Sequence, residues 1–349
     1  MHFASDNTGP VHPKIMEAIA DANDGKAMAY GNDETTSRAA DKVREVFEAP
    51  DAAVYFVPTG TAANSLILAT LAQPWDKIFC SQAAHINCDE RNGPEFFTGG
   101  AKLVPIGTNE DKVSAEALNA AATKRPHPDV HNAQRGPVSI TQVTERGTLY
   151  SIEEIREICD VAHAFGLPVH MDGARFSNAA VALGLSAAEM TWKAGIDAVS
   201  FGGTKNGCMA VEAVVFFDPK HAWEFELRRK RSAHLFSKHR YLSVQMDAYL
   251  TDGLWRETAE MANAQTSRLK EGLQGIDGVN LPFDPKANMI YFEATQALHR
   301  KAMDAGAVYA IEFGDQDSPD PKEIWTGRLV CDWSVPDDQV DRFLDILSS

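Results

Sequence analysis

A lysine follows two glycines and a threonine at the end of an apolar run, and the rest of the chain is organised around this stretch. Residues 198–201 (Ala-Val-Ser-Phe) are followed directly by Gly202, Gly203, Thr204 and Lys205. The pattern predicts a buried strand that ends in a tight turn. A lysine amine sheltered at a strand end is readily made a nucleophile that forms Schiff bases with carbonyl compounds. The alternative, a solvated lysine in a glycine loop, is equally compatible with this stretch alone.

A second stretch, 33 residues earlier, carries a carboxylate in a similar position. Residues 167–171 (Leu-Pro-Val-His-Met) predict a short strand, and Asp172-Gly173-Ala174-Arg175 follows it. A carboxylate can pair with the pyridinium nitrogen of pyridoxal phosphate and keep it protonated, which makes the ring an electron sink. A lone Asp-Gly is usually only a turn. An acid followed by a strand that ends in Gly-Gly-Thr-Lys is a rarer arrangement, and it favours a cofactor site.

Three further positions beside predicted strands carry polar groups whose signals are weak alone. Thr59-Gly60-Thr61 lies between a predicted strand and a predicted helix, where backbone N–H groups can bind a phosphate, although a simple turn with a threonine cap is the alternative. The stretch is neither a Walker A loop nor a GxGxxG fingerprint. His85 and His131 also follow or precede strands, where a histidine can stack on a ring or act as acid or base.

Two arginines, Arg175 and Arg328, lie near predicted strand ends. An amino-acid substrate has a carboxylate, and the guanidinium fork matches a carboxylate with two parallel hydrogen bonds. The alternative for either arginine alone is a surface ion pair.

The composition is that of an acidic globular protein. The 349 residues are enough for a large core and two domains. With 44% hydrophobic and 23% charged residues, the chain is expected to fold rather than remain disordered. The net charge of −16 argues against nucleic acid or an anionic membrane as a partner.

Cysteine usage and hydropathy bear on the compartment. Five cysteines without a CxxC pair indicate neither a disulfide framework nor a zinc site, so we expect no metal and a reducing compartment. The N-terminus has no basic segment followed by an apolar core, and no apolar run approaches ~18 residues. We therefore expect a cytoplasmic protein.

Strands and helices alternate from about residue 52, which predicts an α/β fold with a mostly parallel sheet covered by helices on both faces. The expected strands of this block are 53–57, 77–80, 102–106, 138–143, 168–171, 197–201 and 213–217. The expected helices are 13–22, 36–47, 65–71, one capped by Ser151 and Glu154, 186–194, 221–231 and 237–275 with a break near 252–253. Ligands of such sheets bind at the carboxyl ends of the strands.

Shorter strands at 289–292 and 328–331 and helices at 296–304 and 337–347 follow. This shift predicts a smaller α+β C-terminal domain. We place the large domain at residues 1–250 and the small one at 251–349.

Taken together, the motifs resemble one family. Asp172-Gly173-Ala174-Arg175 and Gly202-Gly203-Thr204-Lys205, in this order, are its specific signals. Supporting stretches extend the likeness over nearly the whole chain: Ser5-Asp6-Asn7-Thr8, Ala29-Tyr30-Gly31-Asn32-Asp33, Pro58-Thr59-Gly60-Thr61-Ala62-Ala63-Asn64, Ala84-His85 and Lys286-Ala287-Asn288-Met289. The chain is similar to the low-specificity L-threonine aldolases, pyridoxal-phosphate enzymes of fold type I. The resemblance implies an aldehyde-lyase of amino-acid metabolism that cleaves L-threonine, L-allo-threonine and related β-hydroxy amino acids to glycine and an aldehyde.

The resemblance also implies roles for individual residues. Lys205 would bind the cofactor covalently, Asp172 would pair with its pyridinium nitrogen and His85 would stack on its ring. Gly60 and Thr61 would hold the phosphate, with Thr204 near it. The substrate contacts it implies come from Ser5, Arg175, Arg328, His131 and, across a subunit boundary, Tyr30. The family forms dimers and tetramers, so a homodimer or homotetramer is expected.

Several points stay open in the sequence. Many family members have Ser-Asp-Thr where this chain has Ser5-Asp6-Asn7-Thr8, and many have a glycine-rich stretch with an arginine where this chain has residues 231–240. Lys238 or Arg240 would then contact the phosphate. The general base is His85, His131 or a water molecule. The alternative function is another fold type I enzyme, a β-eliminating lyase or an aminotransferase, and a third class is a protein that keeps the fold without activity.

Overall fold

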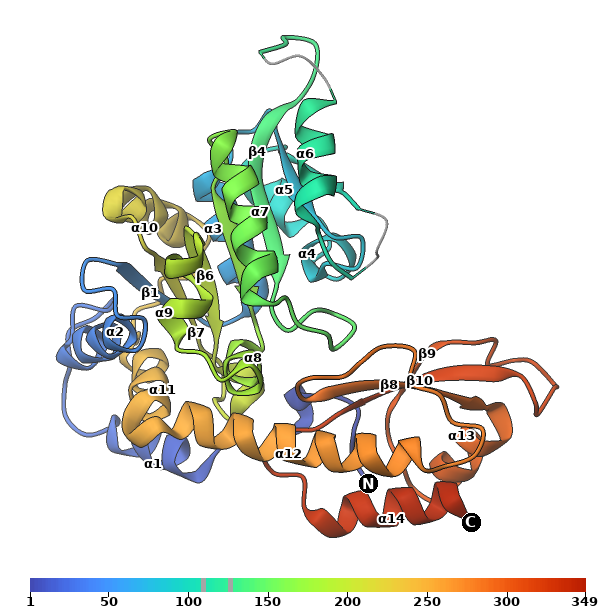
Figure 1. Cartoon of the computed structure of the whole chain (residues 1–349). Coiled ribbons are helices and arrows are strands. Elements are labelled where there is room, and N and C mark those ends of the chain that lie inside the picture. The colour runs from blue at the N-terminus through green and yellow to red at the C-terminus, as the bar shows by residue number, and fades with distance from the viewer. Residues whose placement is uncertain (108–110, 125–127) are drawn as a thin grey trace.

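A computed structural model describes residues 1–107, 111–124 and 128–349 of the chain. A seven-stranded sheet in the order β1-β7-β6-β5-β4-β2-β3 forms its centre (Figure 1). Only β7 runs antiparallel to its neighbours, β1 and β6, and the remaining strand pairs are parallel. The strands are β1 (Ala53–Val57), β2 (Asp76–Cys80), β3 (Lys102–Pro105), β4 (Gln134–Thr141), β5 (Val169–Gly173), β6 (Ala198–Gly202) and β7 (Glu212–Phe216). The mostly parallel α/β sheet expected from the alternating pattern is confirmed.

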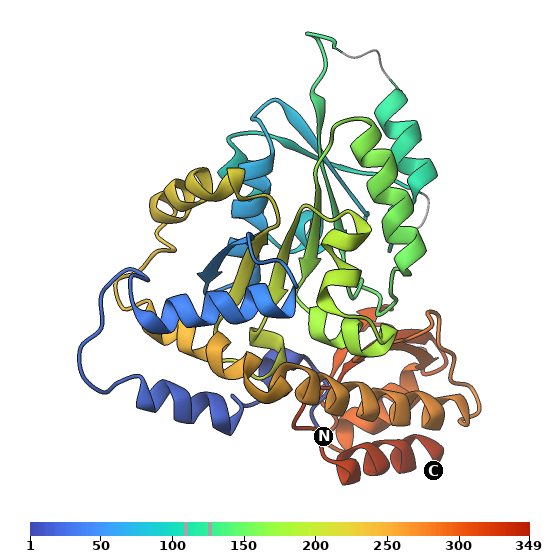
Figure 2. The same ribbon diagram turned by 60° about the vertical axis from the view of Figure 1, so that its left-hand side comes forward.

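Helices cover both faces of this sheet. The helices of the large sheet are α1 (Pro13–Asp21), α2 (Glu34–Val46), α3 (Gly60–Leu71), α4 (His85–Cys88), α5 (Gly93–Thr98), α6 (Ala115–Thr123), α7 (Ile152–Ala164), α8 (Phe176–Leu183), α9 (Ala187–Met190), α10 (Ala222–Arg231) and α11 (Arg240–Leu250). One face packs against α2, α7, α8 and α11, and the other packs against α3, α4 and α10. Figure 2 shows α2 and α11 lying side by side.

The burial of the central strands follows from their sequences. Every residue of β5 and β6 is buried, as expected of parallel strands covered on both faces. Successive side chains alternate between the faces, so Asp172 and Ser200, which are opposite one another in the register of β5 and β6, both face α3. Helix α3 is buried along most of its length, in keeping with its own small and apolar residues.

A second sheet of three antiparallel strands, β8-β10-β9, forms a separate layer. Its strands are β8 (Met289–Thr295), β9 (Ala310–Phe313) and β10 (Ile324–Val330), and its helices are α13 (Gln296–Asp304) and α14 (Asp337–Ser348). Helix α12 (Leu254–Gln274) connects it to the large sheet, and both chain termini lie beside it (Figure 1). Leu254 packs in the core of the large sheet, whereas Leu269 packs with Phe3 in the small one. The domain boundary at residue 250 stays a prediction, and the chain's first residues join the small sheet.

Several elements differ from the expected bounds. Helix α3 begins at Gly60 rather than at residue 65, because the Thr59 hydroxyl accepts a hydrogen bond from the Ala62 amide at 3.2 Å and caps the helix earlier. Strand β4 begins at Gln134, and the helix expected at 186–194 is divided into α9 and a 3₁₀ turn, Trp192–Ala194. Helix α8 and strand β9 were absent from the sequence prediction. Strand β9 was missed because it is only partly buried and lacks an apolar run.

Candidate active site

A cavity of about 260 Å³ opens where the strands of the large sheet end. This volume is slightly below the ~300 Å³ at which small-molecule sites typically begin. The predicted residues Gly60, Thr61, His85, Asp172, Thr204 and Lys205 all line the cavity. Asn7, Asn64, Glu145 and Glu212, which the sequence did not single out, also line it.

Lys205 lies in the 3₁₀ turn Thr204–Asn206 directly after β6. The strand can reach this turn only with glycines, since a Cβ atom on Gly202 would lie 2.4 Å from the carbonyl oxygen of Ala174. The Gly203 amide donates to Oε2 of Glu212 at 3.2 Å. The backbone before Lys205 is thus fixed from both neighbouring strands.

Asp172 is buried at the end of β5, with both carboxylate oxygens accepting hydrogen bonds. Its Oδ1 accepts from the Ala174 amide at 3.0 Å, and its Oδ2 accepts from Nδ2 of Asn64 at 2.8 Å. Two donors and no acceptor suit an ionised carboxylate. The anion expected beside a cationic ring is therefore provided in the cavity wall.

Asn64 connects Asp172 to a second carboxylate. Its Nδ2 also donates to Oε1 of Glu90 at 2.9 Å, and its Oδ1 accepts from the Ser200 hydroxyl at 2.9 Å. Since the Ser200 bond fixes the amide, both N–H groups face the carboxylates. Glu90 in turn contacts Nδ1 of His85 at 2.8 Å. A continuous network therefore extends from Asp172 to His85.

The charges of the His85–Glu90 pair follow from this network. The hydrogen bond to the Glu90 carboxylate raises the pKa of His85, and burial raises the pKa of Glu90. The pair thus holds protons to a higher pH than either group would alone. Because Nδ1 is engaged, the ring of His85 is oriented with its other nitrogen available to the cavity.

The N-terminus of α3 forms one end of the cavity. Thr59, Gly60 and Thr61 all line it, and the space around the Gly60 Cα is open, with no heavy atom within 4 Å of where a Cβ would stand. The first N–H groups of a helix have no partner within it and carry partial positive charge. This end of the cavity can bind an anion such as a phosphate.

Two glutamates add acidic groups to the wall. Burial raises the pKa of Glu212 to about 7, and burial also raises the pKa of Glu145 while Arg175 and Lys205 act against it. The sequence signal for Glu145 was an acid just after a strand, in Thr144-Glu145-Arg146-Gly147, but nothing in the pattern distinguished it from an ordinary turn.

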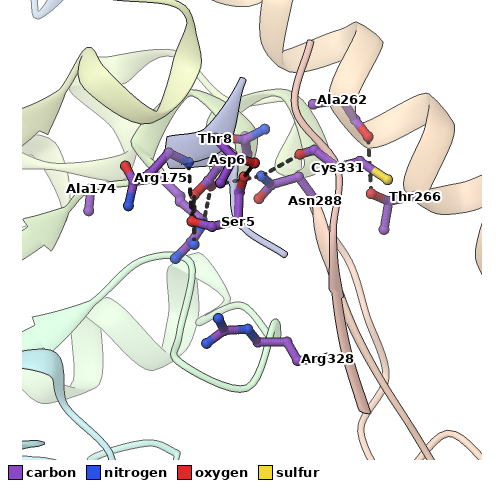
Figure 3. A network of polar contacts seen from close by, with 12 residues as sticks. Ser5, Asp6, Thr8, Ala174, Arg175, Ala262, Thr266, Asn288, Arg328 and Cys331 are labelled. Carbon is purple, nitrogen blue, oxygen red and sulfur yellow. Dashed lines mark hydrogen bonds and ion pairs between the residues drawn. The ribbon is translucent and has the colours of Figure 1, made fainter. Parts of the chain in front are cut away.

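Arg175 is held by the N-terminal segment. Its guanidinium donates from Nε to Oδ2 of Asp6 at 2.7 Å and from an Nη to Oδ1 at 3.1 Å, and Nδ2 of Asn288 donates to the same carboxylate at 3.1 Å. Figure 3 shows these contacts, with Ser5 beside them and Arg328 apart. Burial raises the pKa of the Asp6 carboxyl, but the ion pair with Arg175 and the hydrogen bonds outweigh it. The pKa of Asp6 is therefore held below its usual value.

Arg328 has weaker contacts. One Nη lies 3.1 Å from Oε1 of Glu312, the other donates to the Ala4 carbonyl at 3.4 Å, and Nε is buried without a partner in the described part of the chain. Ser5 caps the 3₁₀ turn Asp6–Thr8, and its hydroxyl accepts a hydrogen bond from the Asn7 amide at 3.1 Å. Neither Ser5 nor either arginine lines the cavity itself, but the N-terminal segment that contains Ser5 contributes Asn7 to its wall.

Four other predicted residues lie outside the cavity of this subunit. Tyr30 is 45% exposed under the amine of Lys230, Lys238 is exposed, and Arg240 donates to the Gly25 carbonyl at 3.3 Å. His131 is exposed just before β4 begins, whereas the cavity lies at the other end of that strand. His131 therefore does not line this cavity, and its approach to the substrate side chain stays a prediction.

Neither a metal site nor a membrane span is visible among residues 1–107, 111–124 and 128–349. No three His, Cys, Asp or Glu side chains there are arranged to hold a metal ion. None of the helices described is both long and apolar enough to cross a bilayer.

Comparison with known proteins places these features in a family. The model of the beta-eliminating lyase family matches residues 2–295. A low specificity L-threonine aldolase of Pseudomonas sp. (strain NCIMB 10558) is 38% identical over 338 residues, 97% of this chain and 94% of that protein. The one from Pseudomonas aeruginosa is equally similar, at 38% identity over the same shares. The structure of a Leishmania major threonine aldolase superposes with a TM-score of 0.92 at 24% identity, over 99% of this chain and 98% of that one. The chain therefore belongs to the beta-eliminating lyase and threonine aldolase family, as its motifs had suggested.

Proposed function

We propose that the protein cleaves L-threonine, L-allo-threonine and related β-hydroxy amino acids to glycine and an aldehyde, with pyridoxal 5'-phosphate as cofactor. The observation that carries the proposal is that Lys205 and Asp172, at the ends of adjacent strands, line one cavity with the N-terminus of α3. The names of the relatives favour an aldolase over the aminotransferase that the sequence left as an alternative.

The residues present suit this cofactor in three respects. A primary amine is available to condense with its aldehyde, an ionised carboxylate is available for its ring nitrogen, and open backbone N–H groups are available for its phosphate. When bound, the cofactor supplies a conjugated ring that delocalises the electron pair left on the substrate Cα.

In this proposal, the chain's own residues bind and orient the cofactor and the substrate. In our assignment Lys205 holds the aldehyde carbon, Asp172 holds the ring nitrogen and His85 covers the ring face. Gly60, Thr61 and Thr204 bind the phosphate. The carboxylate of the substrate would meet the guanidinium of Arg328, supported by Arg175 and Ser5, and this contact would orient the Cα–Cβ bond for cleavage.

The finer assignments belong to the same proposal. We infer a homodimer or homotetramer in the cytoplasm, with Tyr30 and one of Lys238 and Arg240 directed to a neighbouring subunit's site. The exposure of Tyr30 and Lys238 in the single subunit supports this inference. We expect a small-molecule amino-acid substrate and neither nucleic acid nor a membrane as a partner.

One assay tests the proposal. Purified protein with cofactor is incubated with L-threonine and, separately, with D-threonine, and glycine and acetaldehyde are measured. We expect both products in equal amounts from L-threonine only. Conversion of the cofactor to pyridoxamine phosphate with release of a keto acid would instead identify an aminotransferase, and cofactor binding without turnover would identify an inactive member of the fold.

A further inference from the structure

The turn after β4 holds Glu145 over the cavity. The Thr144 amide donates to the Thr148 carbonyl at 3.0 Å, and the Gly147 amide donates to the Thr144 carbonyl at 3.0 Å. Gly147 has φ +80°, and a Cβ there would lie 2.6 Å from the Met289 carbonyl oxygen. The turn is therefore closed on itself and packed directly against β8 of the small sheet.

The backbone of Glu145 itself is anchored from the small sheet. The Tyr291 hydroxyl donates to the Glu145 carbonyl at 3.0 Å, and the Lys286 amide donates to the Gly147 carbonyl at 3.3 Å. These bonds fix the position from which the side chain extends. The carboxylate lines the same cavity as Lys205, His85 and Asp172.

The carboxylate of Glu145 accepts no hydrogen bond from another residue in the described part of the chain, although the positive charges of Arg175 and Lys205 act on it. The other cavity acids are engaged, because Asp172 accepts from Asn64 and Ala174, and Glu212 accepts from the Gly203 amide. Since burial raises the pKa of Glu145, its carboxylate is a stronger base than a solvated one.

The histidines are poorer proton acceptors in this geometry. Nδ1 of His85 contacts the Glu90 carboxylate at 2.8 Å, and this contact raises the pKa of His85 and so favours the ring that carries both protons. A ring protonated on both nitrogens has no lone pair to accept another. His131 lies at the far end of β4.

We propose that Glu145 is the catalytic residue that accepts the proton of the substrate β-hydroxyl. This inference rests on the proposed function. The O–H proton passes to the carboxylate, and the O–H electron pair becomes the second bond between carbon and oxygen of the aldehyde. The Cα–Cβ bond breaks, and its electron pair remains on Cα until a proton is added there to give glycine.

Glu145→Gln, which keeps the size and removes the basicity, tests this role. Glycine lacks the β-hydroxyl, so its binding and the exchange of its Cα protons in D₂O do not need the acceptor. We expect kcat for L-threonine to fall at least about 100-fold, the lower end of the ~10²–10⁴ effect of general acid–base groups. The cofactor absorbance, the Kd for glycine and the exchange rate should stay within about three-fold of wild type. Glu157→Gln, on the exposed side of α7, is the matched control and should be unchanged.

A second variant distinguishes a catalytic role of Glu145 from a structural one. Glu145→Ala leaves space for a small carboxylate, and added formate should restore part of the lost cleavage. Cleavage by Glu145→Gln within about five-fold of wild type would overturn the proposal, and so would an equal loss of glycine exchange or glycine binding. Absence of rescue by formate, with glycine binding intact, would also count against it. If wild-type protein exchanges glycine protons but releases no aldehyde from L-threonine, the proposed function itself has failed, before any variant is compared.

Discussion

Asn64 offers a sharp test of the cavity's hydrogen-bond network, because one amide serves two carboxylates. Its Nδ2 donates to Asp172 at 2.8 Å and to Glu90 at 2.9 Å. Hydrogen bonds to charged groups contribute about 1.5–3 kcal/mol each, so losing both in Asn64→Ala should lower the free energy of unfolding by about 3 kcal/mol or more. Ser200→Ala removes the donor to Oδ1 of Asn64 and the acceptor of a 3.3 Å bond from the Gly173 amide, and we expect a loss of about 1–2 kcal/mol.

Asn64→Asp should be worse than Asn64→Ala at neutral pH, although it changes the shape least. The substitution puts an oxygen where the donors stood, facing two other carboxyl groups, and neighbouring carboxylates cannot all ionise. Urea unfolding of the cofactor-free variants at pH 7 and pH 5 measures the differences. We expect the order Asn64→Asp, Asn64→Ala, Ser200→Ala, wild type in rising stability at pH 7, with Asn64→Asp recovering partly at pH 5. An Asn64→Asp variant as stable as wild type at pH 7 would refute this network.

The other predictions concern the cofactor residues, pH and the substrate carboxylate. Borohydride reduction and peptide mapping should label Lys205, and a label on another lysine would contradict the assignment. Asp172→Asn should fold and bind cofactor but turn over L-threonine more slowly by orders of magnitude in a steady-state assay. Because the folded-state pKa of Glu212 is raised to about 7 from the ordinary 4.5, its contribution to stability is present below pH 4.5 and is lost as the pH rises through 7. The melting temperature of cofactor-free Glu212→Gln should therefore fall less between pH 5 and pH 8 than that of wild type. Arg328→Lys should raise KM for L-threonine more than two-fold while leaving the melting temperature unchanged, whereas Arg175→Lys should lower the melting temperature.

Much of the fold could be predicted from the sequence because the strands of a covered parallel sheet are apolar runs. Strand β1 was predicted with its exact bounds, and β5 and β6 were predicted within one or two residues. Boundaries failed where local hydrogen bonds decide them, as at Thr59, whose side-chain cap starts α3 early. Strand β9 could not be predicted, since its residues are only partly buried and its pairing with β10 is irregular.

The site residues also fall into two groups, those marked by a local sequence pattern and those that depend on contacts between distant segments. Lys205 and Asp172 were predictable because each lies at the end of an apolar strand with a glycine turn beside it. Asn64 and Glu90 were not, because their significance comes from contacts between α3, the α4 region and β5 that no spacing in the chain records. Glu145 depends likewise on packing of its turn against β8. The role of His131 stays a prediction, since its loop precedes β4 and lies away from the cavity.

The two arginines predicted to bind the substrate carboxylate differ in what binding would cost each of them. The Asp6–Arg175 pair is almost fully buried and bidentate, and breaking a buried pair by removing one partner costs roughly 3–5 kcal/mol. A substrate carboxylate that displaced Asp6 would have to offset that loss. Among the residues described, the one ion pair of Arg328 is with the partly exposed Glu312, and a partly exposed pair contributes about 0–1 kcal/mol. Its buried Nε also lacks a partner among the residues described. A carboxylate that reaches Arg328 therefore exchanges a weak contact for a bidentate one, while Arg175 keeps the N-terminal segment, and Asn7 with it, against the cavity.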